Sequence, residues 1–399
     1  MKDYGLLQKR YVVNTYANRG LTLVAGEGAY LRDAEGNSYL DLMTNYGVNI
    51  FGHGHPAISG SLENQVRTLM TLHGSFANDR RAEAAHKLVS RCGGGLSHVF
   101  FSNSGTEANE AALKFAVLAT GKKKFISCRN GYHGKTLGAL SATDGRKFRA
   151  AFEPLLWDFT AVAYNDLSAL EAEIDGQTAA FIVEPVQGEG GIVIPDSGYL
   201  KKAGELCRSR GALLIVDEIQ TGMGRTGRFL ATQDEGLGYD ILTLGKGLGG
   251  GIPIGATLVS PEIAAKIPRS SHTSTFGGNP LAAAGLLATL ELLDETRLVH
   301  VREIGKYFLE GLQTLGSEFI VQVRGKGLML GLEVASGRDE FLKELQREKI
   351  LAIPAADLVV RFLPPYIIER SHVDEALAKI EKVFLSHSHE DEGGRCADF

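Results

Sequence analysis

The sequence lacks the features that mark secreted, membrane-spanning or nucleic-acid-binding proteins. Its four cysteines form no C-x-x-C pair, which argues against a zinc knuckle and a thioredoxin-like motif. No segment is apolar over the roughly 18 residues that a membrane helix needs, and residues 1–18 hold no apolar core of signal-peptide length. The net charge of −5 is not the basic excess typical of nucleic-acid binders. We therefore expect a cytoplasmic protein with reduced thiols and neither a membrane nor a nucleic-acid partner.

The pattern of apolar residues changes along the 399-residue chain. Residues 1–45 predict a leading arm with a small hairpin. Residues 46–276 predict a large domain, because short apolar runs alternate there with helix-like segments. Residues 277–385 begin with two long helices and predict a smaller α+β C-terminal domain. The polar residues 386–399 predict a disordered tail.

The apolar runs of the large domain determine the expected fold class. They lie at 99–101, 125–127, 179–183, 212–216 and 241–244. Continuous apolar runs alternating with helices are typical of a mostly parallel sheet that is covered on both faces. The sequence therefore predicts an α/β protein with a central, mostly parallel sheet and a smaller C-terminal domain.

Three of these predicted strands lead into a charged residue. The run 179–183 is followed by Glu184, 212–216 by Asp217, and 241–244 by Gly245 and then Lys246. Ligands of parallel α/β sheets bind outside the carboxyl ends of the strands. Either carboxylate alone fits a helix cap or an ion-pair partner, but a charge beside the core needs a partner or a ligand. Three of them on strand ends favour a ligand site.

Lys246 lies between glycines directly after a buried strand. A poorly hydrated lysine loses its proton more easily, which is the condition for an amine that forms a Schiff base. A ligand that forms a Schiff base and also contains a pyridine ring needs a second group. A carboxylate directed at the pyridine nitrogen keeps that nitrogen protonated, and the ring then withdraws electrons from the Schiff base. Asp217 is the candidate for that carboxylate.

A phosphate site is predicted where the strand 99–101 passes into a helix. Ser104 and Glu107 have capping-box spacing, and the free N–H groups of Gly105 and Thr106 are suited to a dianion. An ordinary helix cap is the alternative. Two G-x-G-x-x-G matches, at 222–227 and 245–250, open no predicted helix, so we do not expect a dinucleotide site.

Several longer motifs together resemble one family. They are GHGHP (52–56), NSGTEAN (103–109), VEPVQGEG (183–190), DEIQTGMGRTG (217–227), KGLGGG (246–251), STFGGN (274–279) and RGKG (324–327). In this order they resemble the class III, ornithine/acetylornithine-type aminotransferases of fold type I, which depend on pyridoxal 5'-phosphate (PLP). The resemblance covers residues 10–385.

The resemblance implies a role for each matching residue. Lys246 is similar to the lysine that carries PLP and moves the proton, and Asp217 to the partner of the pyridine nitrogen. The other implied cofactor-binding residues are Gln220 and Glu184 near the ring hydroxyl, Tyr132 stacked on the ring, Ser104, Gly105 and Thr106 at the phosphate, and Thr275 donated by a second subunit. A homodimer with shared active sites is therefore implied. His53 and His55 belong to a structural loop in this family, so we expect no metal site.

Substrate binding is implied for three further residues. Arg361 resembles the arginine that binds a carboxylate of 2-oxoglutarate bidentately, and Glu189 the switch that pairs with this arginine when the dicarboxylate is absent. The family usually has arginine where this chain has Lys135. Lysine keeps the positive charge of arginine but lacks its planar pair of N–H groups. We therefore expect either a substrate other than acetylornithine or weaker binding of acetylornithine.

The predicted reaction is a transamination from an N-acetylornithine-like diamino acid to 2-oxoglutarate, in arginine or lysine synthesis. Alternatives within the fold are an ornithine, LysW-type or 4-aminobutyrate aminotransferase and an aminomutase, which needs no external keto acid. A PLP-binding regulator without turnover is the alternative from a different class. The sequence does not determine the donor.

Overall fold

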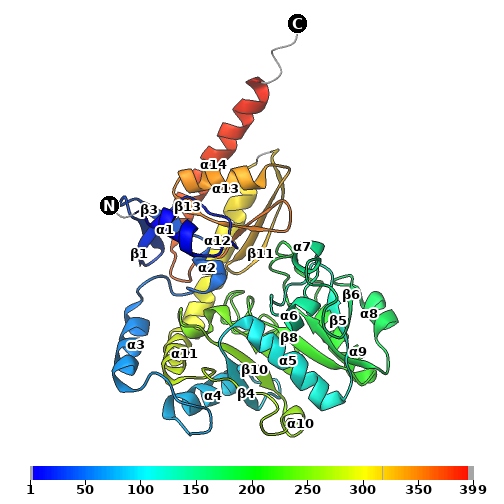
Figure 1. Cartoon of the computed structure of the whole chain (residues 1–399). Helices are drawn as coiled ribbons and strands as arrows, with labels where there is room; N and C mark the ends of the chain where they lie inside the picture. Colours follow the sequence, from blue (N-terminus) through cyan, green and yellow to red (C-terminus); the bar gives the residue numbers. More distant parts are fainter. Residues whose placement is uncertain (1–2, 317, 394–399) are drawn as a thin grey trace.

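A seven-stranded sheet forms the centre of the larger part of the molecule (Figure 1). The computed structural model describes residues 3–316 and 318–393, with side chains up to residue 385. The strand order is β4 (His98–Ser102), β10 (Gly255–Val259), β9 (Ile241–Leu244), β8 (Leu213–Asp217), β7 (Thr178–Val183), β5 (Lys124–Cys128) and β6 (Asp158–Val162). The strands from β9 to β6 pair in parallel, and β10 is antiparallel to both its neighbours. The predicted α/β class with a mostly parallel sheet is confirmed.

Apolar residues cover both faces of this sheet. In β8, Ile215 belongs to one buried cluster, which contains Phe115 of α5 (Gly105–Thr120). Its neighbour Leu214 belongs to a second cluster, which contains Leu200 of α9 (Tyr199–Ser209). Successive side chains of a strand point to opposite faces. The continuous apolar runs in the sequence therefore reflect a sheet that is buried from two sides.

Two smaller sheets lie in the other part of the molecule. One is antiparallel, with the order β11 (Ile320–Lys326), β12 (Met329–Val334), β15 (Val359–Phe362) and β14 (Ile353–Ala355). The other contains β1 (Leu23–Glu27), β2 (Tyr30–Asp33), β3 (Ser38–Asp41) and β13 (Ile350–Leu351). Because β13 pairs in parallel with β3, the N-terminal strands and the C-terminal region share one sheet.

The long helices connect these parts. Helix α11 (Pro280–Leu292) packs against α3 (Pro56–Thr68) and α4 (Asp79–Cys92), beside the large sheet. Helix α12 (Glu295–Thr314) packs against the small sheet and against α14 (Arg370–Gly393). Helix α14 continues to Gly393, through the first eight residues of the predicted tail 386–399; residues 394–399 lie outside the described part.

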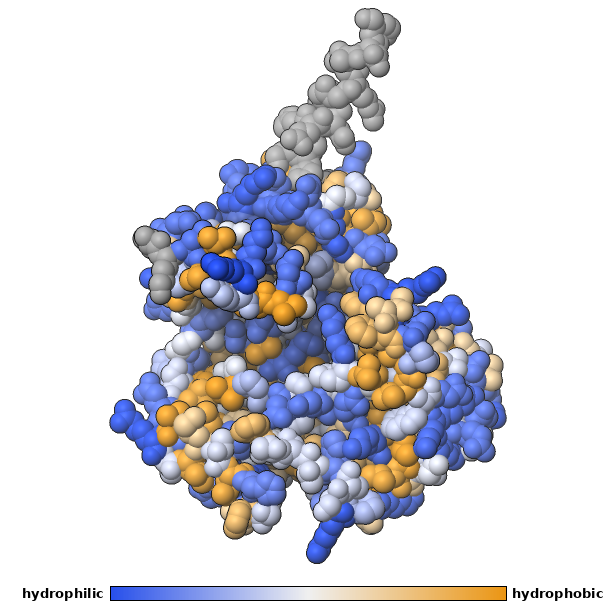
Figure 2. All heavy atoms as spheres, in the orientation of Figure 1, coloured by the Kyte–Doolittle hydropathy of each residue, from blue (hydrophilic) through white to orange (hydrophobic). Residues whose placement is uncertain are grey.

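The remaining helices are short, with three to ten residues each. They are α1 (Tyr4–Tyr11), α2 (Thr44–Gly47), α6 (Leu137–Ala142), α7 (Arg146–Arg149), α8 (Leu167–Glu173), η1 (Gln233–Glu235), η2 (Lys246–Gly249), α10 (Pro261–Ala264) and α13 (Arg338–Arg347). Within the described residues, no helix has both the length and the apolar character needed to cross a membrane. The surface is hollowed between the two parts of the molecule (Figure 2).

Candidate active site

The three charged residues at strand ends lie in one pocket. Strands β7, β8 and β9 are neighbours in the sheet, so Glu184, Asp217 and Lys246 reach the same edge. The pocket has a volume of about 290 Å³. Its lining is Gly105, Thr106, Tyr132, His133, Gly134, Lys135, Glu184, Glu189, Asp217, Ile219, Gln220 and Lys246. The end-of-strand pattern in the sequence thus marks the edge where this pocket lies.

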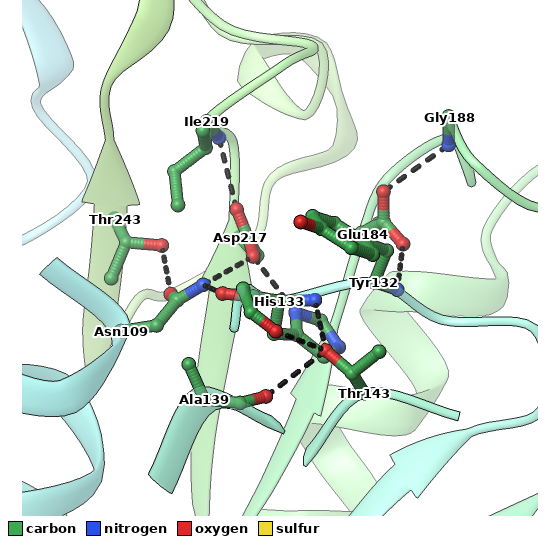
Figure 3. A network of polar contacts seen from close by, with 11 residues as sticks. Asn109, Tyr132, His133, Ala139, Thr143, Glu184, Gly188, Asp217, Ile219 and Thr243 are labelled. Atoms are coloured by element: carbon green, nitrogen blue, oxygen red, sulfur yellow. Dashed lines mark hydrogen bonds and ion pairs between the residues drawn. The ribbon is translucent and has the colours of Figure 1, made fainter. Parts of the chain in front are cut away.

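Asp217 is the most tightly held group of the pocket (Figure 3). Its Oδ2 accepts a hydrogen bond from Asn109 Nδ2 at 2.7 Å and lies 2.8 Å from His133 Nδ1. Its Oδ1 accepts the N–H of Ile219 at 3.0 Å. Asn109 is in turn fixed by Thr243, whose hydroxyl donates to Asn109 Oδ1 at 2.9 Å. This buried carboxylate therefore has a fixed position and orientation.

His133 is a site residue that the sequence reasoning missed. It is buried beside Asp217, and its backbone N–H donates to Thr143 Oγ1 at 2.9 Å. Its ring Nε2 is buried and has no hydrogen-bond partner among the residues that the structure describes. The available signal was its place between Tyr132 and Lys135, both of which were selected. The imidazole positions the carboxylate of Asp217.

Lys246 extends into the pocket from a strained backbone. It is the first residue of η2 and has a φ of 43°, in the left-handed region that non-glycine residues rarely adopt. Its ammonium group has no hydrogen-bond or ion-pair partner within the described ranges 3–316 and 318–393. Burial lowers the pKa of Lys246; the charge of Asp217 opposes this shift and that of Arg361 adds to it. The pocket therefore favours an uncharged amine at this position.

The N-terminus of α5 provides anion-binding groups. Ser104 caps this helix and its hydroxyl accepts the N–H of Glu107 at 3.3 Å, as the capping-box spacing predicts. The N–H groups of Gly105 and Thr106 lack a protein acceptor in the described part of the chain. A Cβ added to Gly105 would lie 2.7 Å from Ile219 Cγ2. The glycine thus allows the helix end to approach the pocket closely.

Glu184 is a buried carboxylate with two backbone donors. Its Oε1 accepts the N–H of Tyr132 at 2.9 Å and its Oε2 that of Gly188 at 3.2 Å. Burial raises the pKa of Glu184 to about 7, although the nearby His133 favours the charged form. Burial also raises the pKa of Tyr132 to about 12. Tyr132 thus stays protonated even at alkaline pH.

Arg361 is fully buried in β15 and has a carboxylate partner. Its Nη2 lies 2.6 Å from Glu189 Oε1, and its Nη1 donates to Gln220 Oε1 at 3.1 Å. Its guanidinium also lies 5.5 Å from the ring centre of Tyr46. Tyr46 was not selected from the sequence; it lies in α2, where Asn45 and Tyr46 have φ values of 52° and 61°. The predicted pairing of Arg361 with Glu189 is present in the structure.

The other predicted residues differ in their location. Lys135 is exposed and lines the pocket. Thr275 is also exposed, and it does not line the pocket of its own chain. His53 Nε2 lies 2.8 Å from Asp41 Oδ2, within the fold. Among residues 3–316 and 318–393, no group of three histidine, cysteine or carboxylate side chains is arranged to hold a metal ion.

The pocket fits a phosphorylated aromatic aldehyde. Helix α5 directs two N–H groups without protein acceptors at one end of it, and Asp217 is a fixed carboxylate within it. Lys246 is an amine whose pKa burial lowers. These are the groups that a phosphate, a ring nitrogen and an aldehyde need, respectively.

Comparisons with known proteins agree with this arrangement. Residues 11–384 match the family Aminotransferase class-III. The chain is 44% identical over 375 residues to the acetylornithine aminotransferase of Methanopyrus kandleri, covering 93% of this chain and 96% of the relative. It is 42% identical over 367 residues to the LysW-aminoadipate semialdehyde/glutamate semialdehyde transaminase of Sulfurisphaera tokodaii, covering 91% and 95%.

A solved structure supports the same assignment. The ornithine aminotransferase from Toxoplasma gondii has a TM-score of 0.93 and 36% sequence identity, with 97% of this chain and 96% of that chain covered. The fold type I assignment is thereby confirmed. The chain belongs to the class III aminotransferases, which are PLP-dependent enzymes.

Proposed function

We propose that the chain transfers the amino group of an N-acetylornithine-like diamino acid to 2-oxoglutarate, which yields a semialdehyde and glutamate. The observation that carries this proposal is the ion pair between the buried Arg361 and Glu189, a residue that lines the same pocket as Lys246. In such a pair, Arg361 binds a carboxylate of the dicarboxylate substrate when Glu189 moves away. Glu189 neutralises Arg361 when the amino donor is bound. The names of the relatives from Methanopyrus kandleri and Sulfurisphaera tokodaii support an acylated or carrier-linked donor.

We propose that PLP is held at three points. The N–H groups of Gly105 and Thr106, with Ser104, would bind the phosphate. Asp217 would bind the ring nitrogen, and Lys246 would bind the aldehyde carbon. Tyr132 would cover the ring, and Gln220 and Glu184 would lie near its hydroxyl group. When bound, PLP supplies an electron-withdrawing ring that stabilises negative charge on the reacting carbon.

Lys246 is the proposed proton carrier. Burial lowers the pKa of its amine, so an uncharged Nζ would accept the proton from the substrate carbon that carries the amino group. The same Nζ would then donate that proton on the cofactor side of the carbon–nitrogen bond. The left-handed backbone at Lys246 and the Asp217 network fix both groups before the substrate arrives. Such fixed geometry lowers the cost of bringing the reacting groups together.

The pair of Arg361 and Glu189 is the proposed means of accepting two different substrates. With the donor bound, Glu189 neutralises Arg361. With 2-oxoglutarate bound, a carboxylate of the substrate replaces Glu189 on the guanidinium. The side chain of Glu189 is 28% exposed, which leaves room for it to move aside.

The active form is proposed to be a cytoplasmic homodimer that serves arginine biosynthesis. Thr275 is exposed and lies outside the pocket of its own chain, which supports a role in the phosphate site of a second subunit. Lys135 is proposed to bind the carboxylate of the donor. Ornithine, a LysW-type substrate and 4-aminobutyrate are the alternative donors.

A panel of amino donors assayed with the purified enzyme and 2-oxoglutarate tests this proposal. We expect N-acetylornithine to give the highest kcat/KM, and we expect Lys135→Arg to change the ranking of donors. Reaction in the absence of 2-oxoglutarate would indicate an aminomutase instead. An unchanged ranking in Lys135→Arg would contradict the role of Lys135.

A further inference from the structure

We infer that Lys147 and Phe148 of α7 determine donor specificity, by forming with Lys135 a carboxylate-binding clamp at the entrance of the pocket. This inference rests on the proposed function, and it names the part of the donor that the site selects. The clamp consists of the Phe148 ring and the ammonium groups of Lys135 and Lys147, which both lie near this ring.

The ring of Phe148 connects α7 to the pocket wall. Tyr132, which lines the pocket, meets Phe148 in an edge-on contact with ring centres 5.6 Å apart and planes at 70°. Lys135 Nζ lies 5.5 Å from the centre of the Phe148 ring, and Lys147 Nζ lies 5.0 Å from the same centre. Helix α7 contacts α6, which follows the segment that carries Tyr132 and Lys135 (Figure 1). Two lysines from different segments thus converge on one ring beside the pocket.

Neither lysine is neutralised by the protein. Both side chains are exposed, and no carboxylate within the described residues forms an ion pair with either of them. Their neighbour Arg149 differs, because its Nη1 donates to the carbonyl oxygens of Ser141 and Thr143 at 3.0 and 3.1 Å. Both ammonium groups lie within 5.5 Å of the centre of the Phe148 ring, and these ring contacts do not remove their charge.

The carboxylates of the pocket are already engaged. Glu184 accepts two backbone N–H groups, Glu189 pairs with Arg361, and Asp217 is held by Asn109 and His133. Lys135 and Lys147 therefore lie beside the pocket without a carboxylate partner among the described residues, and a substrate anion is able to balance their charge.

These features select one class of donor. It has the reacting amine at one end, a carboxylate at the other, and an uncharged substituent next to the carboxylate. In a free diamino acid an α-ammonium group replaces that substituent, and two lysines repel it. An acyl group removes this charge. The clamp therefore favours an acylated diamino acid over the free one.

The test compares Lys147→Met with Arg146→Met in the PLP-loaded enzyme. Lys147→Met keeps an apolar stem over Phe148 and removes only the charge. Arg146 is exposed on the same helix and contacts no aromatic ring in the described part of the chain, so its substitution is a matched control. An exposed ion pair changes affinity by up to about five-fold. We expect Lys147→Met to raise the KM for N-acetylornithine about five-fold, to leave kcat unchanged and not to raise the KM for ornithine.

The control and a salt series make the result specific. Arg146→Met should change both KM values less than about two-fold, and about 0.5 M salt should remove most of the difference between wild type and Lys147→Met. Equal effects of the two substitutions, or equal effects of Lys147→Met on both donors, would overturn the clamp.

A binding measurement separates this inference from the proposed function. N-acetylnorvaline has the carboxylate and the acyl group of the donor but no reacting amine. In calorimetric titration of the PLP-loaded enzyme, we expect it to bind more weakly to Lys147→Met than to wild type and Arg146→Met. Absence of turnover with any donor would contradict the proposed function but not the clamp. Equal affinity of N-acetylnorvaline for wild type, Lys147→Met and Arg146→Met would contradict the clamp but not the proposed function.

Discussion

The exchange of partners on Arg361 gives the sharpest prediction, through the substitution Glu189→Gln. Glu189 Oε1 lies 2.6 Å from Arg361 Nη2, and the backbone oxygen of Glu189 accepts the N–H of Ala356 at 2.8 Å. Glutamine has the same shape and keeps an acceptor oxygen, so the substitution removes the charge and little else. Arg361, which lies behind the pocket-lining residues Glu189 and Gln220, is then left without a counter-charge.

The size of the effect follows from the geometry. Two unit charges about 4 Å apart interact by roughly 4 kcal/mol at an effective dielectric constant of about 20. The side chain of Glu189 is 28% exposed, so solvent screens a large part of this energy. We therefore expect a net change of about 1.4 kcal/mol, which is a ten-fold change in affinity.

Rapid-mixing measurements of the two half-reactions are the appropriate assay. In Glu189→Gln, 2-oxoglutarate no longer competes with a protein carboxylate, so its dissociation constant should fall about ten-fold. The donor half-reaction should lose efficiency, because Arg361 keeps its charge and has no counter-charge while the donor is bound. Glu171→Gln is the matched control, since Glu171 forms an exposed ion pair with Arg210 at 2.9 Å on the surface. An unchanged or weaker affinity for 2-oxoglutarate in Glu189→Gln would refute the exchange of partners.

Three further predictions concern the cofactor side of the pocket. In Lys246→Ala, borohydride reduction should leave no PLP-labelled peptide by mass spectrometry, and transamination should be lost; retained activity would contradict the role of Lys246. Asp217→Asn should lower kcat about a hundred-fold, with the overall fold intact by circular dichroism. Because burial raises the pKa of Glu184 from 4.5 to about 7, the cofactor-free protein should lose stability as pH rises through that range. Glu184→Gln should remove this decline, and melting temperatures from pH 5 to 7.5 that still decline in the variant would contradict it.

Much of the site was predictable because it depends on local pattern. The apolar runs predict β7, β8 and β9, and parallel strands place their carboxyl ends at one edge, so Glu184, Asp217 and Lys246 meet there. The capping-box spacing of Ser104 and Glu107 likewise predicts where α5 begins.

Other features depend on contacts between distant segments. The two-residue strand β13 pairs with β3, although about 310 residues separate them, and so short a strand has no periodicity to detect. Helix α11 follows the large domain in sequence but packs against α3 and α4. Helix α14 extends to Gly393 through a polar segment whose composition predicted disorder.

By itself, the sequence determined the fold class, the strand ends that carry charge and the helix end suited to phosphate. Only the tertiary structure decided that the His133 ring contacts the Asp217 carboxylate. The same holds for the contacts of Lys135 and Lys147 with the ring of Phe148. The physical reason is that apolar periodicity and helix caps act between residues close in the chain. Hydrogen bonds and ring contacts between side chains of separate segments depend on how those segments pack.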